Sequence, residues 1–398
     1  MAGGRPRLLL FSASSSYDGR PIDVTESRGS QVKLEGIEIV RASVSLRDPI
    51  RTSFGSLDQR DLVLLRAVTA EAEGWGECVA FKTPLYSSEY ADAAATVLER
   101  FLIPQVLARP DISAETVAEV LHPIRGHRMA KAALEAAILD AQLREWGVSF
   151  ARYLGVTRDR VPAGVSIGIR KSIADLIDVV GGFLDEGYRR IKIKIAPGWD
   201  LEPVRALRER FGADLPLQVD ANAAYTLADA AHLAQLDEFG LQLMEQPLGE
   251  EQLRQHAELA RLVSTPIALD ESVVSAECAA DAIAMRACRI VNIKPGRVGG
   301  YLEGRRIHDL CRANGLAVWC GGMAETGIGR AANVALAALP GFMPGDNSAS
   351  GRYFEQDLTE PFTLDDGHLT VPSGPGIGVT PLPDVLKSIT SSTTWLPA

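Results

Sequence analysis

The sequence predicts an α/β fold, a TIM-like (β/α)7β barrel with an α+β capping domain. From about residue 161 onward, short apolar runs alternate with helical stretches, a pattern typical of a parallel sheet. Polar residues close these runs at a nearly constant interval: Asp220, Glu245 and Asp270 are 25 residues apart, and Lys294 follows 24 residues later. One strand, one helix and two loops need about that much chain, since a βαβ unit takes about 30 residues.

The barrel elements are expected at regular positions. Strand-like runs occupy residues 164–169, 190–195, 217–220, 241–245, 266–269, 290–293 and 317–319, and an eighth strand near 342–345 would close the barrel. Helical segments between them include residues 203–211, 226–236 and 301–313. In a closed barrel the carboxyl ends of all strands meet at one face, where active sites lie. The acids and lysines are therefore expected to converge.

The N-terminal part has a different order of elements. Strand-like runs at 37–40, 62–68 and 74–79 precede helical stretches at 88–100, 114–121 and 130–146. Strands followed by helices predict an α+β domain. We expect a capping domain over 34–158, the barrel over 159–354, and a Pro- and Gly-rich segment, 355–398, that returns to the cap. Residues 1–33 are predicted to be a disordered extension.

Composition restricts the class of protein. The 398 residues are 46% hydrophobic and 23% charged, with a net charge of −10. The acidic balance, without a basic cluster, argues against nucleic-acid binding, and no apolar run approaches the roughly 20 residues that span a membrane. The five cysteines are scattered and lack a C-x-x-C pair, which is typical of reduced thiols in a cytoplasmic protein.

The three acids have the chemistry of a site for a hard metal ion. Asp220, Glu245 and Asp270 offer only carboxylate oxygens, and no His or Cys accompanies them at that spacing. Such a donor set favours Mg²⁺, or Mn²⁺, over zinc. A single Asp at a strand–helix junction is more often a helix N-cap. Three acids in register with the lysines favour the metal interpretation. Glu271 is expected to point away from its neighbour Asp270.

The lysines suit proton transfer. Lys192 and Lys194 are two residues apart on one strand and therefore point to the same face, while Lys294 ends a strand across the barrel mouth. A nearby divalent cation would lower the pKa of a lysine, which makes it a usable general base near neutral pH. This geometry suits removal of a proton next to a carboxylate, with a metal stabilising the resulting enediolate.

Two other classes of function remain open. A barrel lysine can form a Schiff base with a carbonyl substrate, as in an aldolase, but that chemistry does not need three aligned acids. A non-catalytic barrel kept for an interaction is the third alternative. Loss of one acid or lysine from the set would favour it, and here the set is complete.

Three segments carry a resemblance to a known family. Residues 190–200 (RIKIKIAPGWD), 291–300 (VNIKPGRVGG) and 319–327 (WCGGMAETG) resemble the enolase superfamily, muconate lactonizing enzyme subgroup. The nearest pattern is the branch that contains o-succinylbenzoate synthase and N-acylamino acid (N-succinylamino acid) racemase. The resemblance runs from about Gly36 to the C-terminus.

The resemblance implies a role for each matching position. Lys194 and Lys294 match the two catalytic bases, and Lys192 matches the lysine that supports the first of them. Asp220, Glu245 and Asp270 match the ligands of Mg²⁺. The cap segments 51–56 and 84–90 match loops that close the barrel mouth. The expected substrate-binding residues are Phe54, Tyr86, Ser166, Asn222, Arg297, Gly322 and Met323.

The resemblance leaves the reaction open. A racemase needs a base on each face of the substrate, whereas a synthase needs one base and can use the other lysine as a cation. Arg297 is expected to lower the pKa of Lys294 through like charge, and in the family an arginine there leans toward racemase activity. A muconate cycloisomerase-like lactonizing enzyme, or another racemase or epimerase of the superfamily, is the alternative. A small carboxylate substrate and a homo-oligomer, from dimer to octamer, are expected.

Overall fold

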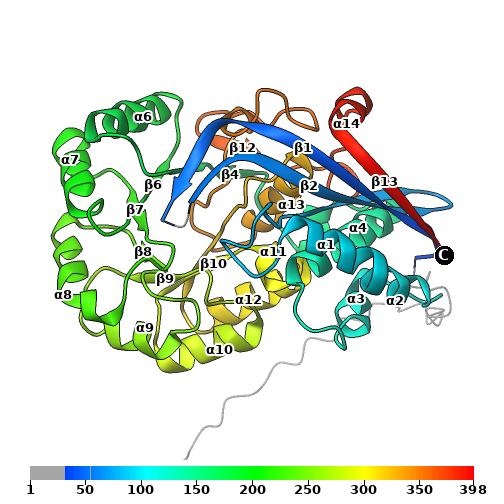
Figure 1. Cartoon of the computed structure of the whole chain (residues 1–398), viewed down its shortest axis with the longest axis horizontal. Coiled ribbons are helices and arrows are strands. Elements are labelled where there is room, and N and C mark those ends of the chain that lie inside the picture. The colour runs from blue at the N-terminus through cyan, green and yellow to red at the C-terminus, as the bar shows by residue number, and fades with distance from the viewer. Residues whose placement is uncertain (1–31, 54) are drawn as a thin grey trace, which may run out of the picture. The chain divides into compact units, whose positions relative to one another are not determined.

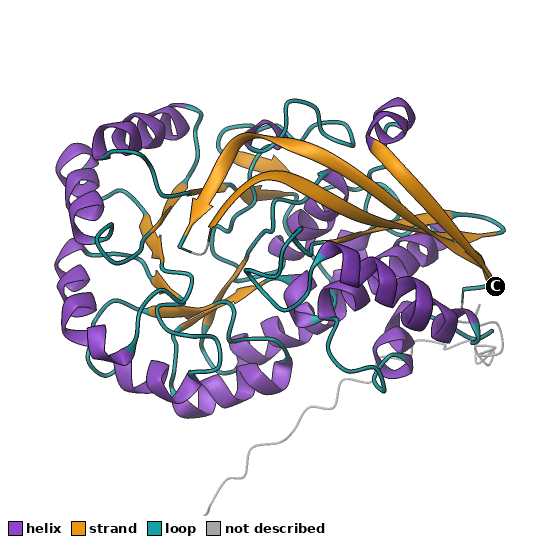
Figure 2. Cartoon of the chain, in the orientation of Figure 1, coloured by secondary structure: helices purple, strands orange, loops and turns teal. Residues whose placement is uncertain are grey.

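The computed structural model describes residues 32–53 and 55–398. The predicted extension therefore lies almost wholly outside the described residues, and so does Phe54. The described chain contains a seven-stranded sheet and a separate four-stranded sheet. Figure 2 shows helices around the first of these sheets.

The seven-stranded sheet is parallel, and each strand pairs with its neighbours in the sequence. Its strands are β5 (Gly164–Ile167), β6 (Arg190–Lys194), β7 (Leu217–Asp220), β8 (Met244–Glu245), β9 (Ile267–Leu269), β10 (Ile290–Ile293) and β11 (Ala317–Cys320). In Figure 1 the connecting helices form the outer layer. They include α6 (Ile173–Asp185), α7 (Leu201–Phe211), α9 (Leu253–Leu259), α10 (Ala276–Met285) and α12 (Tyr301–Ala313). This order is the predicted alternation of strand and helix.

The expected eighth strand is an irregular segment instead. Phe342 forms an isolated parallel bridge with Val318 of β11, and Gly345 forms one with Ala163 beside β5. Pro344 lies between them and has no N–H to donate, so a continuous ladder cannot form. The segment nevertheless contacts both edges of the sheet and joins them.

The predicted helix over 226–236 is only partly α-helical. It consists of two 3₁₀ segments, η3 (Leu227–Asp229) and η4 (Ala234–Phe239), on either side of the short α8 (Ala230–Leu233). Asp229 is the last residue of η3, and Gly240 directly follows η4. Short 3₁₀ pieces are common at helix termini.

The four-stranded sheet is antiparallel, in the order β13-β1-β2-β3. Its strands are β1 (Leu34–Thr52), β2 (Gly55–Thr69), β3 (Glu73–Cys78) and β13 (Thr390–Pro397). The β1–β2 hairpin reaches over the barrel sheet, as Figure 1 shows. There the Ile169 N–H donates to the Arg51 carbonyl at 2.9 Å, and the Ser53 hydroxyl donates to the Asn222 carbonyl at 3.2 Å.

Small residues pack β3 against the long helix α4 (Arg128–Trp146). Ala133, Ala137 and Ala141 recur every four residues and so lie on one face of the helix. Gly74 and Gly76 of β3 approach the backbone of this face so closely that a Cβ at either would clash with it. The sheet and the helix therefore share a tightly packed core.

The remaining elements surround these two sheets. They are α1 (Ala91–Val97), the π-helical turn η2 (Leu98–Leu102), α2 (Ile103–Leu107), α3 (Ala114–Val120), α5 (Phe150–Leu154), β4 (Arg160–Pro162), α11 (Pro295–Val298), α13 (Gly327–Ala337), η5 (Ser350–Arg352), β12 (His368–Thr370) and α14 (Pro383–Ile389). β12 pairs with β4, and β13 pairs with β1. The exact domain boundaries stay predictions. None of the described helices combines the length and the apolar composition that a membrane span requires.

Candidate active site

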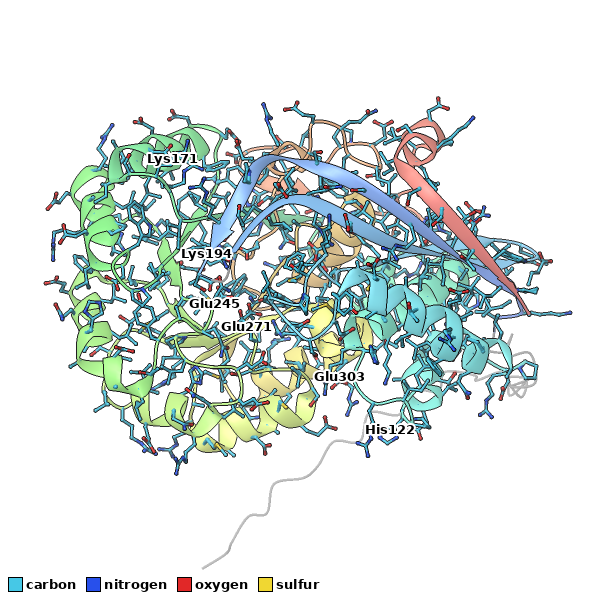
Figure 3. All side chains as sticks on the ribbon, in the orientation of Figure 1. His122, Lys171, Lys194, Glu245, Glu271 and Glu303 are labelled. Atoms are coloured by element: carbon cyan, nitrogen blue, oxygen red, sulfur yellow. The ribbon has the colours of Figure 1, made fainter. Side chains whose placement is uncertain are left out.

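The predicted acids and lysines lie at the same end of the barrel sheet. Lys192 and Lys194 are on β6, Asp220 ends β7, and Glu245 ends β8. The two remaining members, Asp270 and Lys294, directly follow β9 and β10. Because the strands are parallel, their carboxyl ends meet at one face. Figure 3 places Lys194 and Glu245 inside the ring of helices, whereas Lys171 and Glu303 lie at the periphery.

Each predicted acid forms an ion pair with a lysine. Lys192 Nζ lies 2.7 Å from Glu245 Oε2 and 3.2 Å from Asp220 Oδ2. Lys194 Nζ contacts the same Asp220 oxygen at 2.6 Å. Lys294 Nζ lies 2.8 Å from Asp270 Oδ2. The structure therefore brings together all six residues that the sequence singled out.

These contacts hold Lys192 and Lys294 in the charged form. Burial acts to lower the pKa of each lysine, but the surrounding negative groups outweigh it and raise the pKa above the ordinary value. Burial acts oppositely on Asp220, yet Lys194 and Lys192 lower the pKa of that carboxyl. At Lys294 the groups that oppose burial are Tyr86 first and then Glu271, Glu245 and Asp220. The lowering expected beside a divalent cation stays a prediction.

Asp346 is a charged residue of the site that the sequence reasoning missed. It follows the irregular segment 342–345, and its carboxylate lies 2.8 Å from both Lys192 Nζ and Arg190 Nη1. These two cations lower its pKa to about 2 against the effect of burial. Trp319 lies below them, with its ring centroid 4.5 Å from Lys192 Nζ. The sequence does contain a signal for Asp346, because this acid directly follows the expected eighth strand, as the other acids follow theirs.

Arg297 and Lys294 contact the same carboxylate, Asp270. The Arg297 guanidinium pairs with Asp270 and donates to the carbonyls of Val273, at 2.8 Å, and Asn292, at 2.5 Å. It is buried, and it lines a neighbouring cavity rather than the one that contains the lysines. Arg297 therefore compensates the charge of Asp270 from the side away from the cavity that contains the lysines.

Glu271 lies beside the site and lines the neighbouring cavity with Arg297 rather than the one that contains the lysines. Asn222 Nδ2 donates to Glu271 Oε1 at 3.0 Å, and Figure 3 shows Glu271 near Glu245. Burial, with the nearby charge of Asp220, raises the pKa of Glu271 to about 7. The strand β9 ends at Leu269, so strand alternation does not extend to Glu271. Asn222 itself has a left-handed φ of 41° and donates its N–H to Asp220 Oδ1, so it forms the turn and supports the acid.

A cavity above these residues has walls from both sheets. The β1–β2 hairpin contributes Thr52, Ser56 and Leu57, and the following cap loop contributes Leu85 and Tyr86. Ser166, Asn222, Gly322 and Met323 line it from the barrel side, together with the three lysines and Asp346. The Tyr86 hydroxyl accepts a hydrogen bond from Lys294 Nζ at 3.2 Å. Five of the seven expected substrate-binding residues therefore line this cavity.

The donor set fits a divalent cation, although the carboxylates are engaged with cations of the protein. No group of three or more His, Cys, Asp or Glu side chains within the described residues is arranged to hold a metal. Two further buried oxygens nearby, Asn222 Oδ1 and Glu271 Oε2, have no hydrogen-bond partner there. Surplus oxygen acceptors beside three carboxylates match the ligand chemistry of Mg²⁺.

Comparison with known proteins agrees with this geometry. The family model described as the mandelate racemase/muconate lactonizing enzyme N-terminal domain matches residues 35–155, and the enolase C-terminal domain-like model matches 175–385. An N-succinylamino acid racemase from Amycolatopsis is 62% identical over 92% of this chain and 100% of its own length. An o-succinylbenzoate synthase from Geobacillus kaustophilus is 45% identical over 87% of this chain and 93% of its own.

The fold comparison leads to the same family. A crystal structure of an enolase-superfamily member from Listeria innocua superposes with a TM-score of 0.88 at 38% identity, covering 92% of this chain and 99% of that one. The two family models together cover both sheets except β5 and β13, and they include all of the predicted acids and lysines. The chain therefore belongs to the mandelate racemase/muconate lactonizing enzyme family of the enolase superfamily.

Proposed function

We propose that this enzyme moves the proton α to a carboxylate, as an N-acylamino acid or N-succinylamino acid racemase, an o-succinylbenzoate synthase, or both. One observation carries the proposal: Lys194 on β6 and Lys294 after β10 both line one cavity, from strands separated by three others in the sheet. Two amines that reach one cavity from separate strands supply a base for each face of a bound substrate.

The charge of the cavity supports a carboxylate substrate. Lys192, Lys194 and Lys294 line it together with a single acid, Asp346. Glu245 and Asp270 are fully buried beneath this surface. A substrate that presents carboxylate oxygens therefore meets three ammonium groups, each of which also contacts a carboxylate of the protein.

Asp220, Glu245 and Asp270 are the residues that would hold Mg²⁺, with Mn²⁺ as the alternative. When bound, the ion supplies positive charge beside the substrate carboxylate. The same three carboxylates now engage the lysines. The pKa of Lys294 is raised by Tyr86 and Glu271 and also by Glu245 and Asp220. A cation that neutralises the last two would remove part of this effect and favour the base form of the lysine.

Each lysine would have a defined task in racemisation. One removes the α-proton from its face of the substrate, and the other, in its ammonium form, returns a proton to the opposite face. Lys192, held by Glu245 and Asp346, stays charged and supports Lys194. The 62% identical racemase favours this two-base chemistry.

The synthase reaction is the second candidate, because a relative at 45% identity carries that name. It needs one lysine as base, while the other stays cationic beside the substrate. We also propose a cytoplasmic location and a homo-oligomer. The described cysteines, all free thiols, support the location, and the family resemblance supports the assembly.

A panel of substrates tests the proposal. The protein with Mg²⁺ would be incubated with single enantiomers of N-succinyl and N-acetyl amino acids, with the o-succinylbenzoate precursor, and with muconate. We expect loss of optical rotation with the N-succinyl compounds. Turnover of the precursor alone would identify a synthase, turnover of muconate alone a lactonizing enzyme, and turnover of none would contradict the proposal.

A further inference from the structure

The turn Gly321–Glu325, between β11 and α13, forms part of the cavity wall. Gly322, Met323 and Ala324 line the cavity. Ala324 has a φ of 54°, a left-handed conformation that costs a non-glycine residue about 1–3 kcal/mol unless its surroundings impose it. The shape of this wall therefore depends on the contacts that hold the turn.

The buried carboxylate of Glu325 holds the turn from behind. Its Oε2 accepts a hydrogen bond from the Met323 N–H at 2.8 Å, and its Oε1 accepts one from Asn333 Nδ2 at 3.0 Å. A Cβ at Gly322 would lie only 3.1 Å from Glu325 Oε2. The carboxylate therefore packs directly against the Gly322–Met323 peptide and fixes the position of this peptide in the cavity wall.

A second buried carboxylate, from the antiparallel sheet, reaches the same place. Glu77 of β3 accepts hydrogen bonds from the N–H groups of Thr326, at 3.1 Å, and Gly329, at 3.2 Å, and from the Thr326 hydroxyl at 2.7 Å. A Cβ at Gly329 would lie 2.8 Å from Glu325 Cγ and 3.1 Å from Glu77 Oε2. The two acids therefore meet at the first turn of α13.

Arg60 of β2 is a buried cation whose charge interacts with both acids. It is 0% exposed, and both Glu77 and Glu325 oppose the lowering of its pKa by burial. Its Nη1 donates to the Ala80 carbonyl at 3.3 Å, while Nε and Nη2 have no hydrogen-bond partner in the described chain. An arginine buried at this depth is stable only beside negative charge. We call Arg60, Glu77 and Glu325 the buried triad.

The buried triad lies behind two different parts of the cavity wall. Arg60 stacks on Phe81, with its guanidinium carbon 4.9 Å from the ring centroid, and Phe81 lines the cavity. Arg60 also belongs to the strand whose first residues, Gly55 to Leu57, line it. Glu325 supports the barrel part of the wall. The triad therefore links the hairpin wall to the Gly321–Glu325 turn.

We propose that the buried triad positions the Gly322–Met323 peptide and thereby determines which acyl groups the cavity accepts. Glu325 does not line the cavity and acts through Met323, so it is a positioning residue. The substrate in this inference rests on the proposed function, whereas the positioning of the turn does not.

A matched pair of variants tests the proposal. Glu325→Gln removes the charge at the turn. Glu135→Gln removes a comparable buried carboxylate, which accepts from the N–H groups of Tyr301 and Leu302 at the start of α12 and does not line the cavity. Glu325→Gln should raise the KM for N-succinyl substrates relative to N-acetyl substrates about tenfold, as the loss of one charged hydrogen bond predicts, with kcat nearly unchanged. Glu135→Gln should leave this ratio unchanged.

Hydrogen–deuterium exchange supplies a readout that needs no substrate. Amides of the 321–330 segment should exchange faster in Glu325→Gln than in the wild type, and at the wild-type rate in Glu135→Gln. Arg60→Met should reproduce both effects, and adding Glu325→Gln to it should change little more, since neighbours in one network are not additive.

Two results would overturn the proposal: unchanged exchange at 321–330 in Glu325→Gln, or an equal shift of the KM ratio in Glu135→Gln. If the wild type acts on neither acyl series, the proposed function fails instead. The exchange comparison then decides the positioning role by itself.

Discussion

At the scale of single residues, Lys192 has the most constrained charge in the site. Its Nζ contacts Glu245, Asp346 and Asp220, and the ring of Trp319 lies beneath it. Breaking one partner of a buried ion pair costs about 3–5 kcal/mol when nothing replaces it. Here two carboxylates remain after the loss of any one, so the network tolerates a single neutral substitution.

Glu245→Gln should therefore separate metal binding from folding. The amide keeps an oxygen that can accept from Asn292 Nδ2, as Glu245 Oε1 now does at 2.7 Å, and Lys192 keeps two acids. We expect Mg²⁺ affinity, measured by calorimetry, to fall at least about tenfold, because one anionic ligand is lost, and turnover to disappear while the melting temperature changes little.

Glu303→Gln is the control for that experiment. Glu303 caps the start of α10 through the Ala276 N–H at 2.7 Å and lies away from the site in Figure 3. The Glu303→Gln variant should bind Mg²⁺ as the wild type does. Full wild-type turnover in excess chelator would contradict the metal assignment.

The sequence predicted the residues at regular strand ends better than those in turns. Asp220, Glu245 and Lys294 were found because an even spacing and a parallel sheet bring strand ends together. The direction of Glu271 stays a prediction, because this residue lies past the end of β9, where the backbone no longer alternates. Asp346 was missed because its strand is irregular and its role depends on Arg190 and Lys192 from a distant strand.

At the scale of elements, the packing of β3 on α4 depends on two glycines. Gly76→Ala should lower the free energy of unfolding by about 1–3 kcal/mol, the usual cost of overpacking, because its Cβ would clash with the Ala133 carbonyl. Chemical denaturation would measure this loss.

Gly182→Ala in α6 is the matched control, since nothing lies within 4 Å of its Cβ position. Alanine is the better helix former by about 1 kcal/mol, so this variant should be as stable as the wild type or more so. Equal stability of the two alanine variants would contradict the close packing of β3 on α4.

Most element types followed from the sequence pattern, the exceptions being residues 226–236 and 342–345, but element lengths did not. The apolar run at residues 37–40 predicted a short strand, whereas β1 extends over 19 residues. Its distal half is rich in polar and charged residues and includes Pro49, where the register with β2 shifts between Ser45 and Ile50. Pairing within the hairpin extends this strand, and a single-strand pattern does not reveal such pairing.

At the scale of the whole molecule, the barrel supplies the reactive groups and the antiparallel sheet completes their enclosure. The hairpin and the loop with Tyr86 line the same cavity as the three lysines. The buried triad lies between the part of the cavity wall that the hairpin forms and the part that the barrel forms. The sequence predicted the partition into cap and barrel, but not the triad, because Arg60, Glu77 and Glu325 come together only in the folded chain.

In the proposed reaction, Lys194 and Lys294 act on opposite faces of one substrate. Exchange of the α-proton in D₂O tests this proposal most directly, with single enantiomers of an N-succinylamino acid followed by NMR. The wild type should incorporate deuterium into both enantiomers. Lys194→Ala should lose exchange with one enantiomer and Lys294→Ala with the other, each by about 10²–10⁴-fold, the usual contribution of a general base. Exchange of both enantiomers at wild-type rates in both variants would show that the two lysines do not act as bases on opposite faces.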